Sequence, residues 1–437
     1  MTTETVARDA RGEQSSVQDM VARFVGDCTK IWWEAGDGRP AYGPAYDSKE
    51  QQRREAEMKR FQDTVSAEAR RAPRSANERA ATKERIIAAF RAFAGGALGD
   101  AEGHLGTLLE RGLPEVGTIF AQTAKRFDPG IAGSDVFQAM RNVWTMNCLQ
   151  LLLGLPIQLT PAVFAYSMLY PYTDNYLDDP AIAEADKRAF NERFGRRLSG
   201  ERVTPAGPLE SKVDLMVGLI EGQFPRSQFP QVHGSLLAIH QAQIQSVQLM
   251  RRHVSPYEVD VLGISLEKGG TSVLADGYLV AGALNEAQAA YMFGWGAFLQ
   301  LGDDLQDVEQ DSEDGLSTVF SQAAGRWPLD ALTDRALHFG QKVIRGLDAF
   351  DADSAEPVKQ LSRRSASRLM VDSAGGASRF FTPGYIEELE RHSAVRFSFL
   401  KERQKHMAGQ SAAIMALVEA FARFDESDAP PPFPLPK

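Results

Sequence analysis

The chain of 437 residues contains only two cysteines and no long hydrophobic run. Cys28 and Cys148 are too few for a disulfide scaffold, and such a low count is typical of a reducing compartment. The most apolar stretch, residues 149–155, is far too short to cross a bilayer. Residues 1–9 lack the apolar segment of a secretion signal. We therefore expect a cytoplasmic protein without stable membrane insertion.

An excess of basic residues is also missing. The sequence has 48 Lys and Arg residues against 58 Asp and Glu residues, which gives a net charge of −10. Nucleic-acid binders and proteins held at a membrane surface by basic segments need a positive footprint, so both classes are disfavoured. Hydrophobic residues make up 43% of the chain, which is enough for a large buried core.

Common catalytic motifs are absent as well. The seven histidines form no His-x-x-x-His pair and no cluster with carboxylates, which argues against a zinc hydrolase. No Gly-x-Ser-x-Gly, Walker or Gly-x-Gly-x-x-Gly element stands between a strand and a helix. Serine hydrolase, nucleotide-binding and dinucleotide-binding sites of the usual kinds are therefore not expected.

The alternating pattern of β-strands is nearly absent, whereas apolar residues recur three and four positions apart from about residue 88 onward. This period predicts helices over 136–153, 162–177, 212–220, 235–250, 284–305 and 414–424. Breaks that contain proline separate several of these segments. We therefore predict an all-α fold that forms one large helical bundle.

The bundle is expected to span residues 86–425. Residues 1–85 are expected to be an N-terminal extension, partly helical or disordered, with an amphipathic helix at 17–33 and a loop at 36–46. Residues 426–437 form a Pro-rich tail for which we predict disorder.

Two clusters of aspartates follow apolar helical segments and are the most informative feature of the sequence. The first comprises Asp174, Asp178 and Asp179, and the second comprises Asp303, Asp304, Asp307 and Asp311. Residues four apart share a face of a helix, so like charges would be stacked there and would destabilise it unless a cation lies between them. Mg²⁺ prefers such oxygen ligands and completes its shell with water and phosphate oxygens. The clusters are therefore candidate magnesium sites.

An acidic helix end that faces solvent is the alternative interpretation of each cluster. Acidic residues stabilise the N-terminal end of a helix, however, and both clusters come at the C-terminal end of an apolar run. The segments 174–186 and 303–314 hold five and seven acidic residues and no Lys or Arg. Because the negative charge is concentrated in these two places, its expected counter-charge is magnesium with a diphosphate.

Both clusters resemble motifs of the class I isoprenoid synthase superfamily, most closely of its trans-prenyltransferase branch. Segment 299–307 reads Leu-Gln-Leu-Gly-Asp-Asp-Leu-Gln-Asp and is similar to the family's second motif, Phe-Gln-x-x-Asp-Asp-x-x-Asp. Segment 174–178 reads Asp-Asn-Tyr-Leu-Asp and is similar to the first motif, Asp-Asp-x-x-Asp, with Asn at its second position. With Asp179 it also resembles the Asp-x-x-x-Asp-Asp form of squalene-synthase-like enzymes. The resemblance covers residues 131–311.

The resemblance implies an isoprenoid-synthase-type bundle with a central active-site cavity and an allylic prenyl diphosphate as substrate. It implies three Mg²⁺ ions held by carboxylates of both clusters. The catalytic residues would be Asp174, Asp178, Asp303 and Asp307, and the further metal ligands would be Asp179, Asp304 and Asp311. Members of the family commonly form homodimers, so a homodimer is one expected state.

The resemblance also suggests residues that would bind the diphosphate. Segment 266–274 is similar to the family's Lys-Thr helix break, and Gly269-Gly270 in a helical pattern would mark a kink there. An ordinary loop is the alternative. The diphosphate-binding candidates are Lys268, Thr271, Gln300, Gln245 and Arg251, with Arg396, Lys401 and Arg403 as weaker ones.

Part of the family pattern is missing. Chain-elongating prenyltransferases carry a Gly-Gly-Lys-x-Arg-Pro segment before the first motif, and the corresponding stretch here has only Arg141. The family's Arg-Arg pair after the first motif is not evident, since Arg196-Arg197 stands in a different context. A site for a second diphosphate is therefore not expected.

Residues on the same helix face as the aspartates would line the substrate cavity. These are Tyr166, Tyr170, Trp295, Gly296 and Leu299, with ordinary core packing as the alternative for each aromatic. Aromatic faces attract cations and can shield a carbocation from water. In the family a bulky residue before the first motif shortens the pocket, so Tyr170 would limit the chain length.

Three hypotheses about function follow. The first is a Mg²⁺-dependent terpene synthase, a lyase that ionises one prenyl diphosphate and cyclises or deprotonates the carbocation. The second is a prenyl diphosphate synthase or head-to-head coupling enzyme. The third is a non-catalytic helical partner subunit, which the retained carboxylates disfavour.

Overall fold

The computed structural model describes residues 16–36, 38–71, 73–100, 103–250, 259–424 and 430–436, with only the backbone at 404 and 406–411. Every regular element within these ranges is a helix. The predicted all-α fold is therefore confirmed, and each helical segment predicted from the periodicity lies in or overlaps a helix.

The first half of the described chain contains α1 (Val17–Trp33), α2 (Ser48–Arg71), α3 (Ala76–Gly96), α4 (His104–Glu110), α5 (Leu113–Phe127), α6 (Gly133–Leu152), α7 (Pro161–Asp178), α8 (Glu184–Leu198), α9 (Pro208–Gln223), α10 (Pro230–Ser246) and the 3₁₀ helix η1 (Val247–Met250). The second half contains α11 (Val261–Ala281), α12 (Glu286–Gln306), α13 (Val308–Asp314), α14 (Asp330–Ile344), η2 (Arg345–Ala349), η3 (Asp353–Ala355), α15 (Glu356–Gly376), η4 (Ser378–Phe380), α16 (Pro383–Glu390) and α17 (Phe397–Ala422).

Local sequence signals start the helices that carry the aspartates and their neighbours. Thr160 caps α7 by accepting a hydrogen bond from the backbone N–H of Val163, and Pro161 occupies the first turn, where no N–H is needed. Asp260 caps α11 in the same way. Asn285 and Gln288 form a reciprocal capping box at the start of α12. These caps fix where each helix begins and hence which residues share a face.

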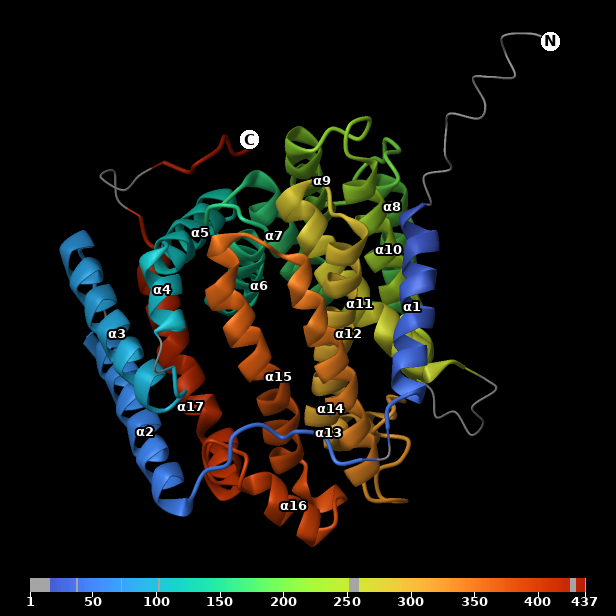
Figure 1. The fold of residues 1–437 in the computed structure, drawn as a ribbon. Helices are drawn as coiled ribbons and strands as arrows, with labels where there is room; N and C mark the ends of the chain where they lie inside the picture. The colour runs from blue at the N-terminus through green and yellow to red at the C-terminus, as the bar shows by residue number, and fades with distance from the viewer. Residues whose placement is uncertain are drawn as a thin grey trace.

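The antiparallel pair α11 and α12 forms the centre of the bundle (Figure 1). Their backbones approach very closely at Gly269 and Gly296. A Cβ atom added to Gly269 would lie 2.4 Å from the backbone oxygen of Gly296, and one added to Gly296 would lie 2.1 Å from the oxygen of Gly269. Helices α1, α6, α7, α10, α14 and α15 pack around this pair. The glycines therefore set the spacing of the two central helices.

Replacing Gly269 with alanine is expected to lower the free energy of unfolding by about 3 kcal/mol, the cost of overpacking a rigid contact. The added methyl group would meet backbone atoms of α12 that cannot move aside. Gly218 on α9 is the matched control, because a Cβ there meets nothing within 4 Å. Alanine at Gly218 should stabilise the helix by up to about 1 kcal/mol. Urea unfolding measures both changes, and equal effects of the two substitutions would contradict the packing argument.

The N-terminal region packs on the bundle. Val17, Phe24 and Trp32 of α1 belong to the buried core, and α1 lies against α10, α11, α12 and α14. Helices α2 and α3 form a hairpin at the opposite side of the molecule, where α2 contacts α17 (Figure 1). The expected boundary between residues 85 and 86 falls inside α3.

Part of the Pro-rich tail is also packed. Phe433 is buried, with its ring centroid 5.6 Å from that of Phe164 on α7. The disorder predicted for the tail is therefore wrong for residues 430–436. The prediction considered only the prolines and overlooked the aromatic anchor between them.

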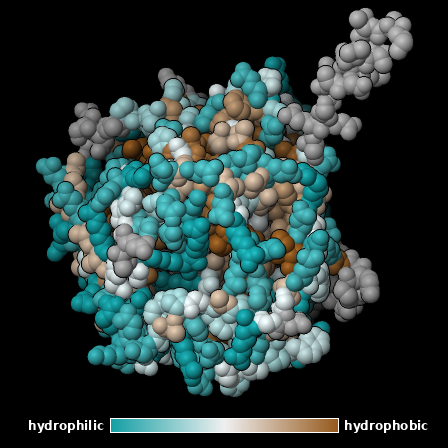
Figure 2. All heavy atoms as spheres, viewed as in Figure 1, coloured by the Kyte–Doolittle hydropathy of each residue, from teal (hydrophilic) through white to brown (hydrophobic). Residues whose placement is uncertain are grey.

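The surface face seen in Figure 2 is mainly polar, with apolar patches between the polar side chains. Among the described residues, no helix has both the length and the apolar character needed to cross a membrane.

Candidate functional site

The first aspartate cluster lies at the C-terminal end of α7. Asp174 is half-buried and its Oδ1 accepts a hydrogen bond from the Thr173 hydroxyl at 3.1 Å. Asp178 and Asp179 are exposed, and Asp179 is the C-cap residue of the helix. Pro180 follows and cannot continue the helix. The carboxylates therefore stand at the end that the helix dipole disfavours, as the sequence indicates.

The second cluster spans the junction of α12 and α13. Asp307 is both the C-cap of α12 and the N-cap of α13, so the stripe is carried over two helices. The expectation that the whole cluster stands at a C-terminal end is therefore wrong for Asp307 and Asp311, which lie at the start of α13, where the helix dipole favours acidic residues. Asp303 and Asp307 are exposed, whereas Asp304 and Asp311 are buried. Gln300 donates a hydrogen bond to Oδ1 of Asp304 at 2.8 Å. The other oxygen of Asp304 is buried and has no hydrogen-bond partner within the part of the chain that the structure describes.

Carboxylates of this second cluster are held in an unfavourable electrostatic environment. Burial, followed by the charges of Asp304 and Asp307, raises the pKa of Asp311 to about 7. Burial likewise raises the pKa of Asp304 to about 6, although the hydrogen bond from Gln300 opposes this. Crowded, partly desolvated carboxylates favour a bound cation as their counter-charge.

Lys268 on α11 interacts electrostatically with aspartates of both clusters. Its charge lowers the pKa of Asp174 on α7 and of Asp303 on α12, against the larger raising effect of burial at both. It acts in the same direction on Asp304 and Asp311. A single ammonium group therefore lies within electrostatic range of both aspartate clusters.

Arg141 on α6 is a second cation near both clusters. Its charge lowers the pKa of Asp303 and acts on Tyr170, whose pKa burial and the neighbouring Asp174 raise to about 12. Arg141 is exposed and makes no ion pair with a described carboxylate. Residues from four helices, α6, α7, α11 and α12, thus contribute charged groups to one region.

The central helices expose one stripe each in this region. On α11 the partly exposed side chains near the middle are Ile264, Glu267, Lys268 and Ser272, and on α12 they are Trp295, Leu299, Gln300 and Asp303. Most of the other side chains of these stretches are buried. Solvent therefore reaches Lys268 and Asp303 along faces that are otherwise closed by packing.

The predicted cavity-lining residues separate into two groups. Tyr166 and Tyr170 on α7 and Trp295 and Leu299 on α12 are at least partly exposed. Trp295 stacks on Tyr291 with centroids 6.3 Å apart. Gly296 is buried instead against Gly269 and has no side chain to offer. Its position is explained by helix packing.

The predicted helix break at Gly269-Gly270 is wrong. Helix α11 continues through both residues, and a Cβ on Gly270 would lie 2.5 Å from the ring of Phe293. The glycines permit close packing on α12. Thr271 is also fully buried, and its hydroxyl donates to the backbone oxygen of Glu267 at 2.7 Å. The hydroxyl of Thr271 therefore serves its own helix, and of the two diphosphate candidates in this segment only Lys268 is accessible.

The remaining diphosphate candidates lie elsewhere. Gln245 is exposed in the last turn of α10, and Arg251 lies outside the described residues. Arg396 forms an ion pair with Glu55 of α2, with N–O distances down to 2.5 Å. Lys401 donates to the Ser378 hydroxyl. Arg396 and Lys401 are therefore engaged away from the aspartates.

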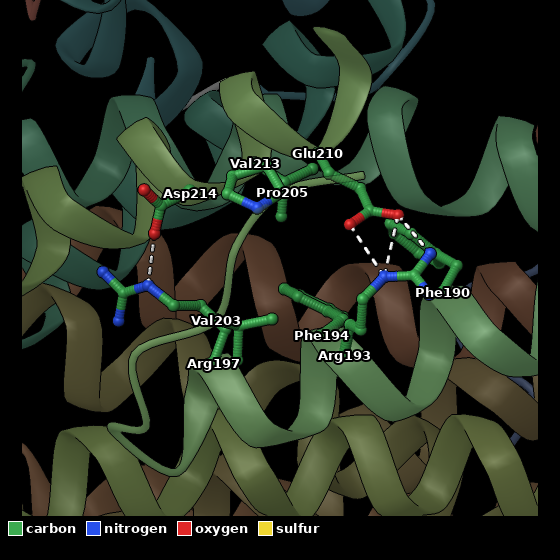
Figure 3. Close-up of a pocket in the computed structure, with 9 residues that line it drawn as sticks. All are labelled: Phe190, Arg193, Phe194, Arg197, Val203, Pro205, Glu210, Val213 and Asp214. Atoms are coloured by element: carbon green, nitrogen blue, oxygen red, sulfur yellow. Dashed lines mark hydrogen bonds and ion pairs between the residues drawn. The ribbon is translucent and has the colours of Figure 1, made fainter. Parts of the chain in front are cut away.

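The arginines that follow the first motif are engaged in ion pairs. Arg193 on α8 contacts Glu210 on α9 at 2.5 Å, and Arg197 contacts both Asp214 and Glu221. Figure 3 shows Arg193 directed at Glu210 and Arg197 directed at Asp214 around a pocket of about 20 Å³, room for a water molecule. These guanidinium groups stabilise the α8–α9 packing.

One buried acid was not selected from the sequence. Asp276 on α11 is 2% exposed, and Asn142 of α6 donates to its Oδ1 at 3.2 Å and to the Ser167 hydroxyl at 3.2 Å. Burial raises the pKa of Asp276 to about 8. Its charge and that of Asp174 both raise the pKa of Tyr166, after the larger effect of burial. The sequence feature that could have identified Asp276 is a single aspartate within an otherwise apolar helical segment.

The carboxylates meet the chemical requirements of Mg²⁺ without forming a complete cage. Within the described ranges, no three His, Cys, Asp or Glu side chains already converge as a metal site. Mg²⁺ sites typically take one or two carboxylates and complete the shell with water and phosphate oxygens. Asp174 and Asp178 on one side and Asp303 and Asp307 on the other fit that pattern, and the unpaired oxygen of Asp304 adds a buried acceptor.

Comparison of the chain with models of protein families, with curated proteins and with solved structures finds no match. The functional argument therefore depends on the residues of the site itself.

Proposed function

We propose that the chain is a Mg²⁺-dependent terpene synthase of the class I isoprenoid type. It would ionise one allylic prenyl diphosphate and convert the carbocation by cyclisation or deprotonation. The observation that carries the proposal is the position of Lys268, whose charge acts on Asp174 of one cluster and on Asp303 of the other. Acidic groups from two helices with one shared ammonium group suit a diphosphate bound together with divalent cations.

Each group at the site has a distinct task in this proposal. Asp174, Asp178, Asp303 and Asp307 would hold Mg²⁺, with Asp179, Asp304 and Asp311 as further acceptors. Bound Mg²⁺ would neutralise the diphosphate and make it a better leaving group. Lys268 and Arg141 would donate hydrogen bonds to diphosphate oxygens, and Gln300 would orient Asp304 through its 2.8 Å hydrogen bond.

The proposed reaction breaks the bond between the allylic carbon and the diphosphate oxygen. The electron pair leaves with diphosphate, and the carbocation then closes a ring or loses a proton to the solvent or to released diphosphate. The partly exposed rings of Tyr166, Tyr170 and Trp295 would face the carbocation, since aromatic faces attract cations. Their bulk would also keep water away from it.

The proposed use of one diphosphate is supported by the arginines of α8. A coupling or elongating enzyme needs cationic groups for a second diphosphate, but Arg193 and Arg197 are neutralised by Glu210, Asp214 and Glu221. Arg141 is an accessible arginine near the clusters within the described part of the chain.

Product analysis tests this function. The purified chain is incubated with Mg²⁺ and with prenyl diphosphates of each length from C10 to C25, with and without isopentenyl diphosphate, and hexane extracts are analysed by mass spectrometry. We expect a hydrocarbon or alcohol from a single diphosphate, and no product when EDTA replaces Mg²⁺. Longer diphosphates that form only with isopentenyl diphosphate would assign the chain to the elongating enzymes. No turnover of any substrate would leave the non-catalytic subunit as the surviving hypothesis.

A further inference from the structure

A large apolar pocket lies between the α2–α3 hairpin and the helices α5, α6 and α17. It has a volume of about 520 Å³. Its walls include Phe61, Ile87, Phe93, Trp144, Ile414 and Phe421. No aspartate of the two clusters lines it, and neither do Lys268, Tyr166, Tyr170, Trp295 or Leu299. The pocket is therefore separate from the proposed catalytic site.

The pocket has room for a long hydrocarbon chain. An apolar cavity of about 150 Å³ binds benzene, so 520 Å³ accommodates on the order of twenty carbon atoms. The aromatic rings of Phe61 and Phe93 stack face to face at 4.9 Å on one wall. Filling the space with apolar groups would remove this lining from water.

Arg403 on α17 gives the pocket a positive charge that no described carboxylate pairs with. Its guanidinium contacts the sulfur of Met58. With the Gln62 amide oriented so that its oxygen faces Arg403, that oxygen accepts hydrogen bonds from the guanidinium at 2.8 and 2.9 Å. No carboxylate among the described residues forms an ion pair with it. The charge of Asp372 acts to raise the pKa of Arg403, but Asp372 is already paired with Arg368 at an N–O distance of 3.1 Å.

The other cation at the pocket is neutralised. Lys83 on α3 forms an ion pair of 2.8 Å with Glu115 on α5. Arg403 is partly buried, and this burial, followed by the charge of Arg368, lowers the pKa of its guanidinium. An anion placed beside Arg403 would offset this cost, and guanidinium binds carboxylate and phosphate through paired hydrogen bonds.

We propose that this pocket binds a single-chain amphiphile with an anionic head group, a carboxylate or a phosphate. Its head group contacts Arg403, and its alkyl or prenyl chain lies between the α2–α3 hairpin and α17. The apolar lining supplies most of the binding free energy, and Arg403 selects for charge. The ligand is distinct from the diphosphate substrate, whose multiple charges need the aspartate-bound cations.

A competition experiment tests the proposal on the full chain after lipid removal. The fluorescent fatty acid 11-(dansylamino)undecanoate is bound first and displaced by dodecanoate, dodecyl phosphate or dodecanol, which share a C12 chain. We expect at least one of the two anions to displace it at a concentration at least about tenfold below that of dodecanol. Which anion binds tighter identifies the head group.

Variants locate the ligand. Arg403→Met should weaken binding of the anions at least about tenfold and leave dodecanol within twofold, because the methionine keeps the apolar volume. Ile87→Trp should weaken all three ligands by filling the pocket, with helix content unchanged by circular dichroism. Arg196→Met, which removes an exposed charge on α8, is the control and should bind like the unmodified chain.

Three results would overturn the proposal. These are equal displacement by dodecanol and both anions, an Arg403→Met variant that binds the anions normally, and loss of binding in the Asp303→Asn, Asp307→Asn double variant. The last result would place the amphiphile at the aspartates. Because the binding readout needs no turnover, failure of the proposed terpene synthase activity does not affect it.

Discussion

Replacing Asp303 and Asp307 together with asparagine is expected to lower the turnover of prenyl diphosphates by at least about 10³-fold, the scale seen when preorganised electrostatic groups are removed. Asparagine keeps the shape and one oxygen of each side chain but removes the two negative charges that would hold Mg²⁺. The helices should remain intact, because both side chains are exposed and neither supports the core.

Stability measurements separate this loss from unfolding. The charge of Asp307 raises the pKa of Asp303, after the larger effect of burial, so the two carboxylates repel each other in the unliganded chain. The double variant should therefore melt at the same temperature as the unmodified chain or slightly higher. Addition of Mg²⁺ with inorganic diphosphate should raise the melting temperature of the unmodified chain and leave that of the variant unchanged.

A matched control removes two carboxylates elsewhere. Asp27 on α1 and Asp63 on α2 are exposed and lie outside both clusters. The Asp27→Asn, Asp63→Asn double variant has the same net charge as the site variant and should retain full turnover. If the Asp303→Asn, Asp307→Asn variant were as active as this control, the proposed metal site would be wrong.

Helix positions and the placement of the first cluster could be predicted from the sequence because they depend on local rules. The period of three and four residues, the cap at Thr160 and the stop at Pro180 together define α7 to within one or two residues. The same rules place Asp303 on a helix, but they assign no continuous helix to the segment of Lys268 and do not bring the two residues together. Their proximity depends on how α11 and α12 pair, which is a long-range property.

The glycines of α11 illustrate where sequence rules fail. Gly269 and Gly270 suggest a kink when the helix is considered alone, because glycine is costly in a helix interior. In the fold Gly269 allows the backbones of α11 and α12 to touch at Gly296, and Gly270 makes room for the ring of Phe293. The cost of each glycine is offset by a packing contact whose partner lies in another helix. The residue pattern of α11 alone does not show which helix packs against its glycines.

The Arg403 pocket was not predictable for a related reason. Its walls come from α2, α3, α5, α6 and α17, and the first and last of these are separated by most of the chain. Residues 1–85 are expected from the sequence to form an N-terminal extension, partly helical or disordered, rather than one wall of a pocket. Helix α2 nevertheless buries Met58 and Ala69. It also buries the charged residues Arg54, Glu55 and Glu68, each of which forms an ion pair.

The second large effect is expected at Asp276, where asparagine should stabilise the chain at alkaline pH. Burial raises the pKa of this carboxyl to about 8, whereas an unfolded chain has an aspartate pKa of about 3.9. Below about pH 4 the carboxyl is protonated in both states. Between about pH 4 and about pH 8 the carboxyl is ionised only in the unfolded state. Each unit of increase in pH therefore lowers the free energy of unfolding by up to about 1.4 kcal/mol.

Asparagine at position 276 removes this pH dependence but can still accept the hydrogen bond from Asn142. The difference in free energy of unfolding between the variant and the unmodified chain should therefore grow from pH 5 to pH 8 by up to about 4 kcal/mol, and level off above it. Urea unfolding at pH 5, 6, 7 and 8 measures the difference, with Asp63→Asn as the exposed control whose difference should stay constant. A difference at Asp276 that does not change with pH would mean that the carboxyl is ionised in the folded chain. Asn142 would then have to stabilise a buried charge at the centre of the bundle through its hydrogen bond to Oδ1 of Asp276.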